Sequence, residues 1–555
     1  MTSNQAPGNE PARGSRSAEG QAGELKEEVL GLARGGSLNL VGQAFTQLVL
    51  LAISAILAHL LGRSGVGIYF QAYAFLSLLG LLSLSGFRAG MTRFVAAHRA
   101  EGDAGAMRGT VRFGMALTMA ISVVLGIALY AAASWLARHA FHEPLLIGPL
   151  RLVAATLPFV TFTDAALSAT QGFKTMGPYT LVGRIFEPGA RIVLTVALLA
   201  AGHGLGGAMV AQLVSNVAAS VLAAWSLRRL MGPPSAAPVY RPRELFSFSM
   251  VSWMASLASQ GLIWAGTIIL GIYLTSADVG TYNVATRLVV MATFVMAPIN
   301  VSFGPRIADL YQRGRMDTLR RTYGVATSWI LRLSLPAFVL LILFPGQLLE
   351  LFGAGFAGAA AVTVILALGK LIDAGTGPCA QMLTMSGRPL LNMIDNVGVL
   401  IANVVLNVFL IPRFGILGAA VAWAVALGAV NLARVVQVQI TLGMLPFDRG
   451  VAKGAAAAVA AFAAGGVVRL VGTGIASVIA GALAIGVAYL GVLLFLGITE
   501  EDRVALRSLL RRVGRGRGSL GAEDESVGGE EAEGTGEAVA EEVTEPTEPP
   551  ATRGR

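Results

Sequence analysis

The chain contains fourteen apolar stretches, each long enough to cross the hydrocarbon core of a bilayer as a helix, which takes ~20 residues. Transmembrane strands would instead alternate polar and apolar residues over ~10 positions. Since a backbone in lipid must satisfy its own hydrogen bonds, uninterrupted apolar stretches of this length require helices. We therefore predict an all-α, polytopic membrane protein with about 14 transmembrane helices. The stretches are residues 38–60, 68–92, 110–134, 148–170, 179–201, 205–230, 246–274, 279–303, 325–350, 359–386, 388–411, 416–442, 450–471 and 474–498.

Composition agrees with a chain that lies mostly in lipid. Hydrophobic residues make up 55% of the 555 residues and charged residues 13%, whereas soluble domains hold about 25% charged residues. The polar segment 1–37 predicts a disordered cytoplasmic N-terminus, and residues 519–555 predict an acidic disordered tail after a basic segment at 499–518. One cysteine and five histidines exclude a disulfide framework within the chain and predict no metal site.

Arginines and lysines gather on alternate connections between the apolar stretches, which predicts the orientation of the chain. If the N-terminus is cytoplasmic, the outer connections carry only four basic residues, Arg63, Arg138, Arg413 and Arg469. The inner connections carry most of the others. We therefore predict a multi-pass protein of the cytoplasmic (plasma) membrane with both termini in the cytoplasm.

Two motifs recur at nearly the same spacing. Val66-Gly67-x-Tyr69 returns 213 positions later as Val279-Gly280-x-Tyr282, and the stretch 204–211 returns as 415–422. This pattern predicts duplication of a six-helix unit, although apolar sequences rich in glycine and alanine also match by chance. Because six is even, both units would enter from the same side, related by a pseudo-two-fold axis along the membrane normal. We interpret the glycine-rich motif as the outer turn between the first two helices of each unit.

The duplication divides the chain into predicted segments. These are an N-terminal lobe (38–230), a cytoplasmic linker (231–245), a C-terminal lobe (246–442) and two additional transmembrane helices (443–498). Transporters built from such repeats bind substrate between the halves and alternate access by moving one half against the other.

Polar side chains deep in the apolar stretches are the candidates for function, because a charge at the centre of a membrane helix costs ~2.5–3.5 kcal/mol unless it pairs or faces water. Some of these residues could instead form internal ion pairs that lock helices together, and the asparagines of 388–411 could join neighbouring helices. The candidates for a substrate-binding cavity are Arg88, Arg184, Glu187, Arg191, Arg287, Gln43, Gln47 and Asn283. The candidates for binding a coupling ion, H⁺ or Na⁺, are Asp164, Lys370, Asp373 and Asp395.

Three stretches carry a family resemblance: Leu60-Leu-Gly-x-x-x-Val-Gly67-x-Tyr69, Gly86-Phe-Arg88-x-Gly90-x-x-Arg93-Phe94 and Gly415-Ile-Leu-Gly418-Ala-Ala-Val-Ala422. Over roughly residues 30–500 the chain resembles the polysaccharide transporter branch of the multidrug/oligosaccharidyl-lipid/polysaccharide exporter superfamily. The resemblance implies a flippase that moves a lipid-linked (polyprenyl diphosphate) oligosaccharide across the inner membrane for surface polysaccharide biosynthesis. It also implies membrane lipids and polysaccharide assembly proteins as partners. We expect no nucleic acid partner and no cofactor beyond a coupling ion.

Alternative functions remain open within the same superfamily. A cation-coupled multidrug exporter would favour an acidic, aromatic cavity, whereas arginine outnumbers carboxylate among the deep residues of the N-terminal lobe. A lipid II flippase has a similar layout, but the first apolar stretch here holds only neutral polar groups. A membrane enzyme would need catalytic motifs such as G-x-S-x-G, H-E-x-x-H or a P-loop, and the sequence has none. We therefore predict no enzymatic activity.

Overall fold

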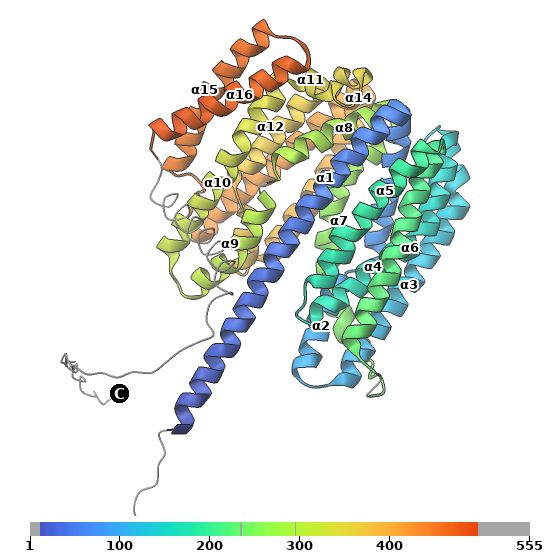
Figure 1. Ribbon diagram of the computed structural model, residues 1–555, viewed down its shortest axis with the longest axis vertical. Coiled ribbons are helices and arrows are strands. Elements are labelled where there is room, and N and C mark those ends of the chain that lie inside the picture. The colour runs from blue at the N-terminus through green and yellow to red at the C-terminus, as the bar shows by residue number, and fades with distance from the viewer. Residues whose placement is uncertain (1–11, 234–235, 295, 498–555) are drawn as a thin grey trace, which may run out of the picture. The chain divides into compact units, whose positions relative to one another are not determined.

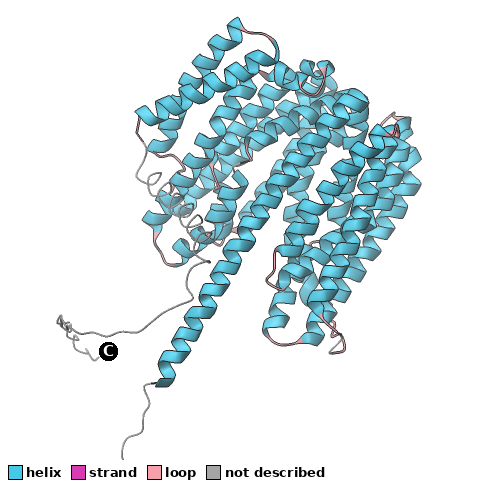
Figure 2. Ribbon diagram, viewed as in Figure 1, coloured by secondary structure: helices cyan, strands magenta, loops and turns pink. Residues whose placement is uncertain are grey.

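The computed structural model describes residues 12–233, 236–294 and 296–497, and within these residues it contains helices and no strands (Figure 2). Four short 3₁₀ or π-helical segments, η1 to η4, join or extend the α-helices. The helices are α1 (Ala12–Leu84), α2 (Phe87–Ala100), α3 (Ala104–Trp135), η1 (Leu136–Ala140), η2 (Pro144–Leu146), α4 (Ile147–Gly172), η3 (Tyr179–Phe186), α5 (Glu187–Ala200), α6 (Gly204–Met231), α7 (Pro242–Tyr273), α8 (Ser276–Ala292), α9 (Met296–Gln312), α10 (Met316–Leu343), α11 (Pro345–Glu350), η4 (Ala354–Ala359), α12 (Ala360–Thr376), α13 (Cys379–Met385), α14 (Pro389–Leu442), α15 (Arg449–Val471) and α16 (Gly474–Phe495).

Ten helical segments in the described part of the chain are long and apolar enough to cross a membrane. Two of them are long enough to cross it twice, the 44 residues of Val41–Leu84 and the 54 residues of Pro389–Leu442. The prediction of an all-α, multi-pass membrane protein is therefore confirmed. The exact number of fourteen spans stays a prediction.

The two long helices are each broken at one glycine. Gly62 in α1 has φ 65° and ψ −171°, and Gly415 in α14 has φ 58° and ψ −137°. These left-handed values favour glycine, which has no Cβ. Both breaks fall where the sequence predicts a connection between spans, but helical structure resumes directly on either side. The chain therefore turns at a single residue, and Gly67 lies in the helix beyond the turn rather than in a loop.

The two copies of the glycine motif meet where α1 packs against α8. A Cβ on Gly67 would overlap the carbonyl oxygen of Ser276, and a Cβ on Gly280 would overlap that of Arg63. Arg63 and Ser276 are themselves 213 positions apart, so the contact is reciprocal. Glycine is required at both positions because each helix approaches the backbone of the other, and this packing requirement replaces the predicted role in a turn.

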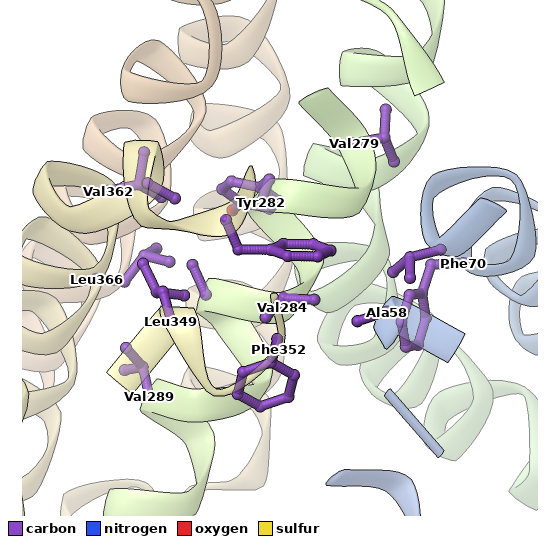
Figure 3. Packing of buried hydrophobic residues seen from close by; sticks show 14 of the residues in the cluster. Ala58, Phe70, Val279, Tyr282, Val284, Val289, Leu349, Phe352, Val362 and Leu366 are labelled. Carbon is purple, nitrogen blue, oxygen red and sulfur yellow. The ribbon is translucent and has the colours of Figure 1, made fainter. Parts of the chain in front are cut away.

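Hydrophobic side chains extend this contact into the core between the two predicted lobes. Ala58 and Phe70 of α1 belong to the same buried cluster as Val279, Tyr282 and Val284 of α8 (Figure 3). In the view of Figure 1, α2 to α6 group on one side of α1, and α9, α10 and α12 lie on the other. Helix α1 therefore lies at the junction of the lobes, where its polar neighbours bound the cavity described below.

A second kind of break interrupts the predicted span 68–92. Ser85 (φ 44°) and Gly86 (φ 75°) separate the end of α1 from α2. A Cβ on Gly86 would overlap the carbonyl oxygen of Ser249 in α7, so the break also lets the two lobes approach each other. Interrupted helices in membrane proteins are tolerated where the freed backbone lines a cavity or is buried in protein. Here the break places Arg88 on the first turn of α2.

The predicted domain boundaries agree with helix ends only in part. Helix α6 ends at Met231 and α7 begins at Pro242, so the linker predicted at 231–245 is shorter by the first turn of α7. The prediction of disorder over 1–37 is wrong for residues 12–37, because α1 begins at Ala12. Alanine, glutamate, leucine and lysine in this segment favour helix, and the apolar span that follows supplies the costly nucleus. Residues 1–11, the basic segment 499–518 and the acidic tail 519–555 lie outside the described residues.

Candidate functional site

A cavity of about 1150 Å³ opens among α1, α2, α4, η3, α5 and α6 of the N-terminal lobe and α7 and α14 of the C-terminal lobe. It exceeds the volume of most small-molecule pockets, about 300–1,000 Å³. Four arginines and two carboxylates line it among the described residues, which gives a surplus of two positive charges. These charged residues are Arg88, Arg93, Arg184, Arg191, Asp164 and Glu187.

Arg88 and Asp164 form an ion pair across the cavity wall. The Nη2 atom of Arg88 lies 2.9 Å from Oδ2 of Asp164, and the two side chains are 48% and 33% exposed. The break before α2 brings Arg88 towards α4, which carries Asp164. Both residues were predicted from sequence, Arg88 for the substrate and Asp164 for a coupling ion. The structure brings them together in one pair.

Arg184 has a different environment, because it makes no ion pair within the described part of the chain. Its Nη2 atom donates a hydrogen bond of 2.9 Å to the hydroxyl of Tyr179, and its guanidinium lies 5.4 Å from the centre of that ring. Both residues belong to the π-helical segment η3, whose i→i+5 hydrogen bonding matches their separation in sequence. The π-helix therefore orients a guanidinium that pairs with no carboxylate among the described residues.

The backbone of η3 is held in place by α1. The hydroxyl of Thr46 donates to the carbonyl oxygen of Arg184 at 2.9 Å. A Cβ on Gly42 would lie 2.6 Å from Cγ2 of Thr180 and 2.9 Å from Cβ of Arg184. Helix α1 thus fixes the position of Arg184 from behind.

Arg191 and Glu187 belong to a buried network with α6. Arg191 is 2% exposed, lies 3.8 Å from Glu187 and donates to Oε1 of Gln212 at 2.9 Å. Glu187 also accepts hydrogen bonds from Ser215 (3.4 Å) and Asn216 (3.2 Å). The network neutralises Arg191 and joins α5 to α6. Arg191 and Glu187 therefore form an internal ion pair, which was the alternative to a substrate-binding role. Both residues still line the cavity.

The wall contributed by the C-terminal lobe is neutral. Among the described residues it consists of hydroxyl and amide side chains of α7 and α14, and the charged residues that line the cavity belong to the N-terminal lobe. The asparagines of the predicted span 388–411 divide into two groups. Asn392 and Asn396 line the cavity, whereas Asn403 and Asn407 are buried and bonded to each other at 2.9 Å. The neutral wall comprises Ser256, Ser259, Gln260, Asn392 and Asn396.

Four of the residues predicted to line the cavity do not line it, so the prediction was wrong for these four. Arg287 lies 5.2 Å from the ring centre of Phe70 and 5.3 Å from that of Trp264, so aromatic faces hold its guanidinium between the lobes. Asn283 is buried and bonded to Val279 and Thr267 within the C-terminal lobe. The other two are Gln43 and Gln47, half-buried on α1.

The remaining candidates for ion coupling, Lys370, Asp373 and Asp395, lie in the C-terminal lobe outside the lining of the cavity. Lys370 and Asp373 are 2.8 Å apart, and Asn431 donates to the other oxygen of Asp373 at 2.8 Å. Asp395 lies 3.7 Å from Arg434 and accepts from Gln437 at 2.8 Å. Each carboxylate thus has a cationic partner of its own. Asp164 belongs to the other lobe, so the four residues do not form one site.

We expect Asp373→Ala to destabilise the protein by about 3–5 kcal/mol, because Lys370 would be left as an unpaired charge in an apolar helix. The double variant Lys370→Met/Asp373→Leu should recover most of this loss. Thermal unfolding of the purified protein measures both effects. The exposed pair of Arg313 and Asp309 is the control, and Asp309→Ala should cost less than about 1 kcal/mol. Unchanged stability of Asp373→Ala together with lost transport would contradict a structural pair and favour ion coupling.

Several residues that line the cavity were not among the candidates predicted from the sequence. Gln212 and Asn216 are four residues apart on α6, and Gln260 is a single amide in an apolar helix. These residues could have been found from the sequence, because each is a polar side chain within a predicted membrane span. The same criterion identified the charged candidates. Tyr179 gave no signal, because only the π-helical segment brings its hydroxyl to Arg184.

Two family profiles match the sequence. The first, described as polysaccharide biosynthesis protein, matches residues 32–311, just over half of the chain. The second, MatE, matches residues 253–409. Together they cover residues 32–409, which comprise the N-terminal lobe and most of the C-terminal lobe.

Curated relatives include the probable flippase AglR of Haloferax volcanii, 29% identical over 243 residues, which are 41% of this chain and 48% of that protein. The probable low-salt glycan biosynthesis flippase Agl15 of the same organism is 27% identical over 212 residues, 38% of this chain and 45% of that protein. The chain thus spans about half the length of the curated relatives it matches. Among solved structures, the lipid II flippase MurJ in an inward closed conformation has a similar fold, with a TM-score of 0.66 and 13% identity over 81% of this chain and 97% of that one.

Proposed function

Because the chain belongs to the polysaccharide biosynthesis protein family of the multidrug/oligosaccharidyl-lipid/polysaccharide exporter superfamily, we propose that it is a flippase for a lipid-linked glycan. Its curated relatives carry the name flippase, and one of them is named for glycan biosynthesis. The cargo would be an oligosaccharide on a polyprenyl diphosphate. The protein would move it across the cytoplasmic membrane for surface polysaccharide assembly, without catalysing a chemical step.

The observation that carries this proposal is the surplus of positive charge in the cavity, to which Arg184 contributes. Guanidinium groups match the oxygens of phosphates in pairs, and such charge-assisted hydrogen bonds are about twice as strong as neutral ones. Arg184 has no carboxylate partner among the residues that the structure describes, and Tyr179 orients its guanidinium. A diphosphate entering the cavity would supply the missing negative charge.

Alternating access would follow from the contact between α1 and α8. With both termini in the cytoplasm, the Gly67–Gly280 contact would close the outer end of the junction between the lobes. Hydrogen bonds at the same end join the lobes, from Ser276 to Glu143 at 2.6 Å and from Arg63 to the carbonyl of Gly355 at 3.1 Å. Release of the cargo outside would require these contacts to separate.

The match to the MatE profile keeps a multidrug exporter as the second candidate. Such an exporter of cationic drugs would need an acidic cavity, and the arginine surplus opposes it. A lipid II flippase is the narrower alternative. It would use the same phosphate chemistry with a different glycan.

Reconstitution into liposomes tests the proposal. Polyprenyl diphosphate carrying a fluorescent oligosaccharide would be placed in the inner leaflet, and its arrival in the outer leaflet would be measured by a membrane-impermeant quencher. We expect translocation with the protein and none in empty liposomes. A multidrug exporter would instead move cationic dyes and leave the lipid-linked glycan in place. A lipid II flippase would move lipid II and reject other lipid-linked glycans.

A further inference from the structure

The two walls of the cavity differ in chemistry, and this difference extends behind the surface of the C-terminal wall. The N-terminal wall carries all the charged residues that line the cavity in the described part of the chain. The C-terminal lobe also holds ionic groups nearby, but Lys370, Asp373, Asp395 and Arg434 are paired and do not line the cavity. The C-terminal lobe therefore presents neutral amides and hydroxyls in front of a neutralised ionic layer.

That layer orients one of the amides. Arg434 is 8% exposed and donates from Nη2 to Oδ1 of Asn396 at 2.7 Å. Asp395 and Asn431 hold the same guanidinium at 3.7 and 3.4 Å. Because the carbonyl oxygen of Asn396 is engaged from behind, its amide N–H groups are the atoms left for a ligand in the cavity.

Gln260 supplies a second amide, from α7. Its side chain lines the cavity and makes no hydrogen bond to the other described residues. A free primary amide offers two donors and an acceptor. Gln260 and Asn396 can therefore complement groups that both donate and accept, as neutral hydroxyls do.

We propose that the C-terminal wall, to which Gln260 and Asn396 belong, is a glycan subsite, and that the cargo lies in the cavity with its diphosphate towards Arg184 and its sugar towards α7 and α14. This inference rests on the proposed function, since it assigns the two parts of the same cargo to the two walls. Phosphate oxygens are anionic and only accept hydrogen bonds, so they favour the guanidinium groups of the N-terminal wall. Sugar hydroxyls are neutral and favour the amides. Gln260 and Asn396 are then specificity-determining residues, and Arg434 is a positioning residue.

Binding measurements with two kinds of probe separate the walls. One probe is decaprenyl diphosphate without sugar, and the other is a panel of the same lipid carrying mono- or disaccharides. We expect the wild-type protein to bind at least one glycan-bearing lipid more tightly than the bare lipid. Gln260→Leu should weaken that binding by about 3- to 10-fold, the loss expected for one or two hydrogen bonds, and leave the bare lipid unaffected. Arg184→Ala should weaken the binding of both probes by the same factor.

Gln347→Leu is the matched control, since Gln347 is a half-buried glutamine of α11 that does not line the cavity. It should bind both probes as the wild type does. Equal binding of bare and glycan-bearing lipids by the wild type, or equal losses for both probes in Gln260→Leu, would overturn the glycan subsite and leave the proposed function standing. Failure of the wild type to bind either probe would overturn the proposed function and the subsite with it.

Discussion

Replacement of Arg184 by alanine is expected to reduce translocation of the lipid-linked glycan by about 10- to 100-fold. Hydrogen bonds to a charged group contribute about 1.5–3 kcal/mol, which corresponds to that range. Arg184 lines the cavity and has no carboxylate partner in the described part of the chain, so its loss removes positive charge from the cavity and breaks no internal ion pair there. Rates in the liposome assay, corrected for protein abundance, measure the effect. Arg184→Lys should recover part of the rate, since lysine keeps the charge but loses the planar fork.

The chain offers a closely matched control for this experiment. Arg151 in α4 also lies over a tyrosine, 5.1 Å from the ring centre of Tyr130, and donates to Ser134 at 3.3 Å. It does not line the cavity. Arg151→Ala should therefore keep the wild-type rate. Wild-type transport by Arg184→Ala would contradict the assignment of this residue to the phosphate.

A valine at Gly67 is expected to reduce translocation by about tenfold or more. The first carbon of the side chain would already overlap the carbonyl oxygen of Ser276, and a helix backbone cannot move aside as a flexible side chain can. The variant should therefore disfavour the conformation in which α1 and α8 touch and populate one in which they separate. Spin labels on the two helices near positions 63 and 276 would report a longer distance.

Gly206→Val tests whether any bulky residue on a helix near this end has the same effect. Gly206 lies in α6, and a Cβ there would meet nothing within 4 Å. This variant should keep the wild-type rate and the wild-type spin-label distance. An unchanged distance in Gly67→Val would contradict the closure of the junction by the glycine contact.

Much of the helical architecture could be predicted from hydrophobicity, because long apolar stretches in lipid permit helices and little else. The recurrence of Gly67 at Gly280 was read from the sequence as a pair of turns, whereas in the structure the two glycines lie at a contact between the lobes. Sequence spacing cannot distinguish a glycine that turns the chain from one that allows two helices to touch. Gly62 has the first role and Gly67 the second.

The candidate site was predicted less completely, because its geometry depends on departures from the regular α-helix. Arg88 reaches the cavity through the break at Ser85 and Gly86, and Arg184 is oriented by a π-helical segment. In the sequence, Arg287 and Arg184 look alike, since each is an arginine within a predicted span. In the structure, Arg287 lies against two aromatic rings and does not line the cavity. The free-energy cost of placing a polar side chain in the membrane indicates that such a residue needs a partner. It does not say whether the partner is water, an aromatic face, a carboxylate or the cargo.

A structure of the protein with decaprenyl diphosphate bound is the most direct test of the central claim, that the positive charge of the N-terminal wall binds a phosphorylated lipid. We predict phosphate oxygens within hydrogen-bonding distance of the Arg184 guanidinium, about 2.7–2.9 Å, with the ion pair of Arg88 and Asp164 beside them. Diphosphate density against the amides of α7 and α14, or outside the cavity altogether, would contradict it.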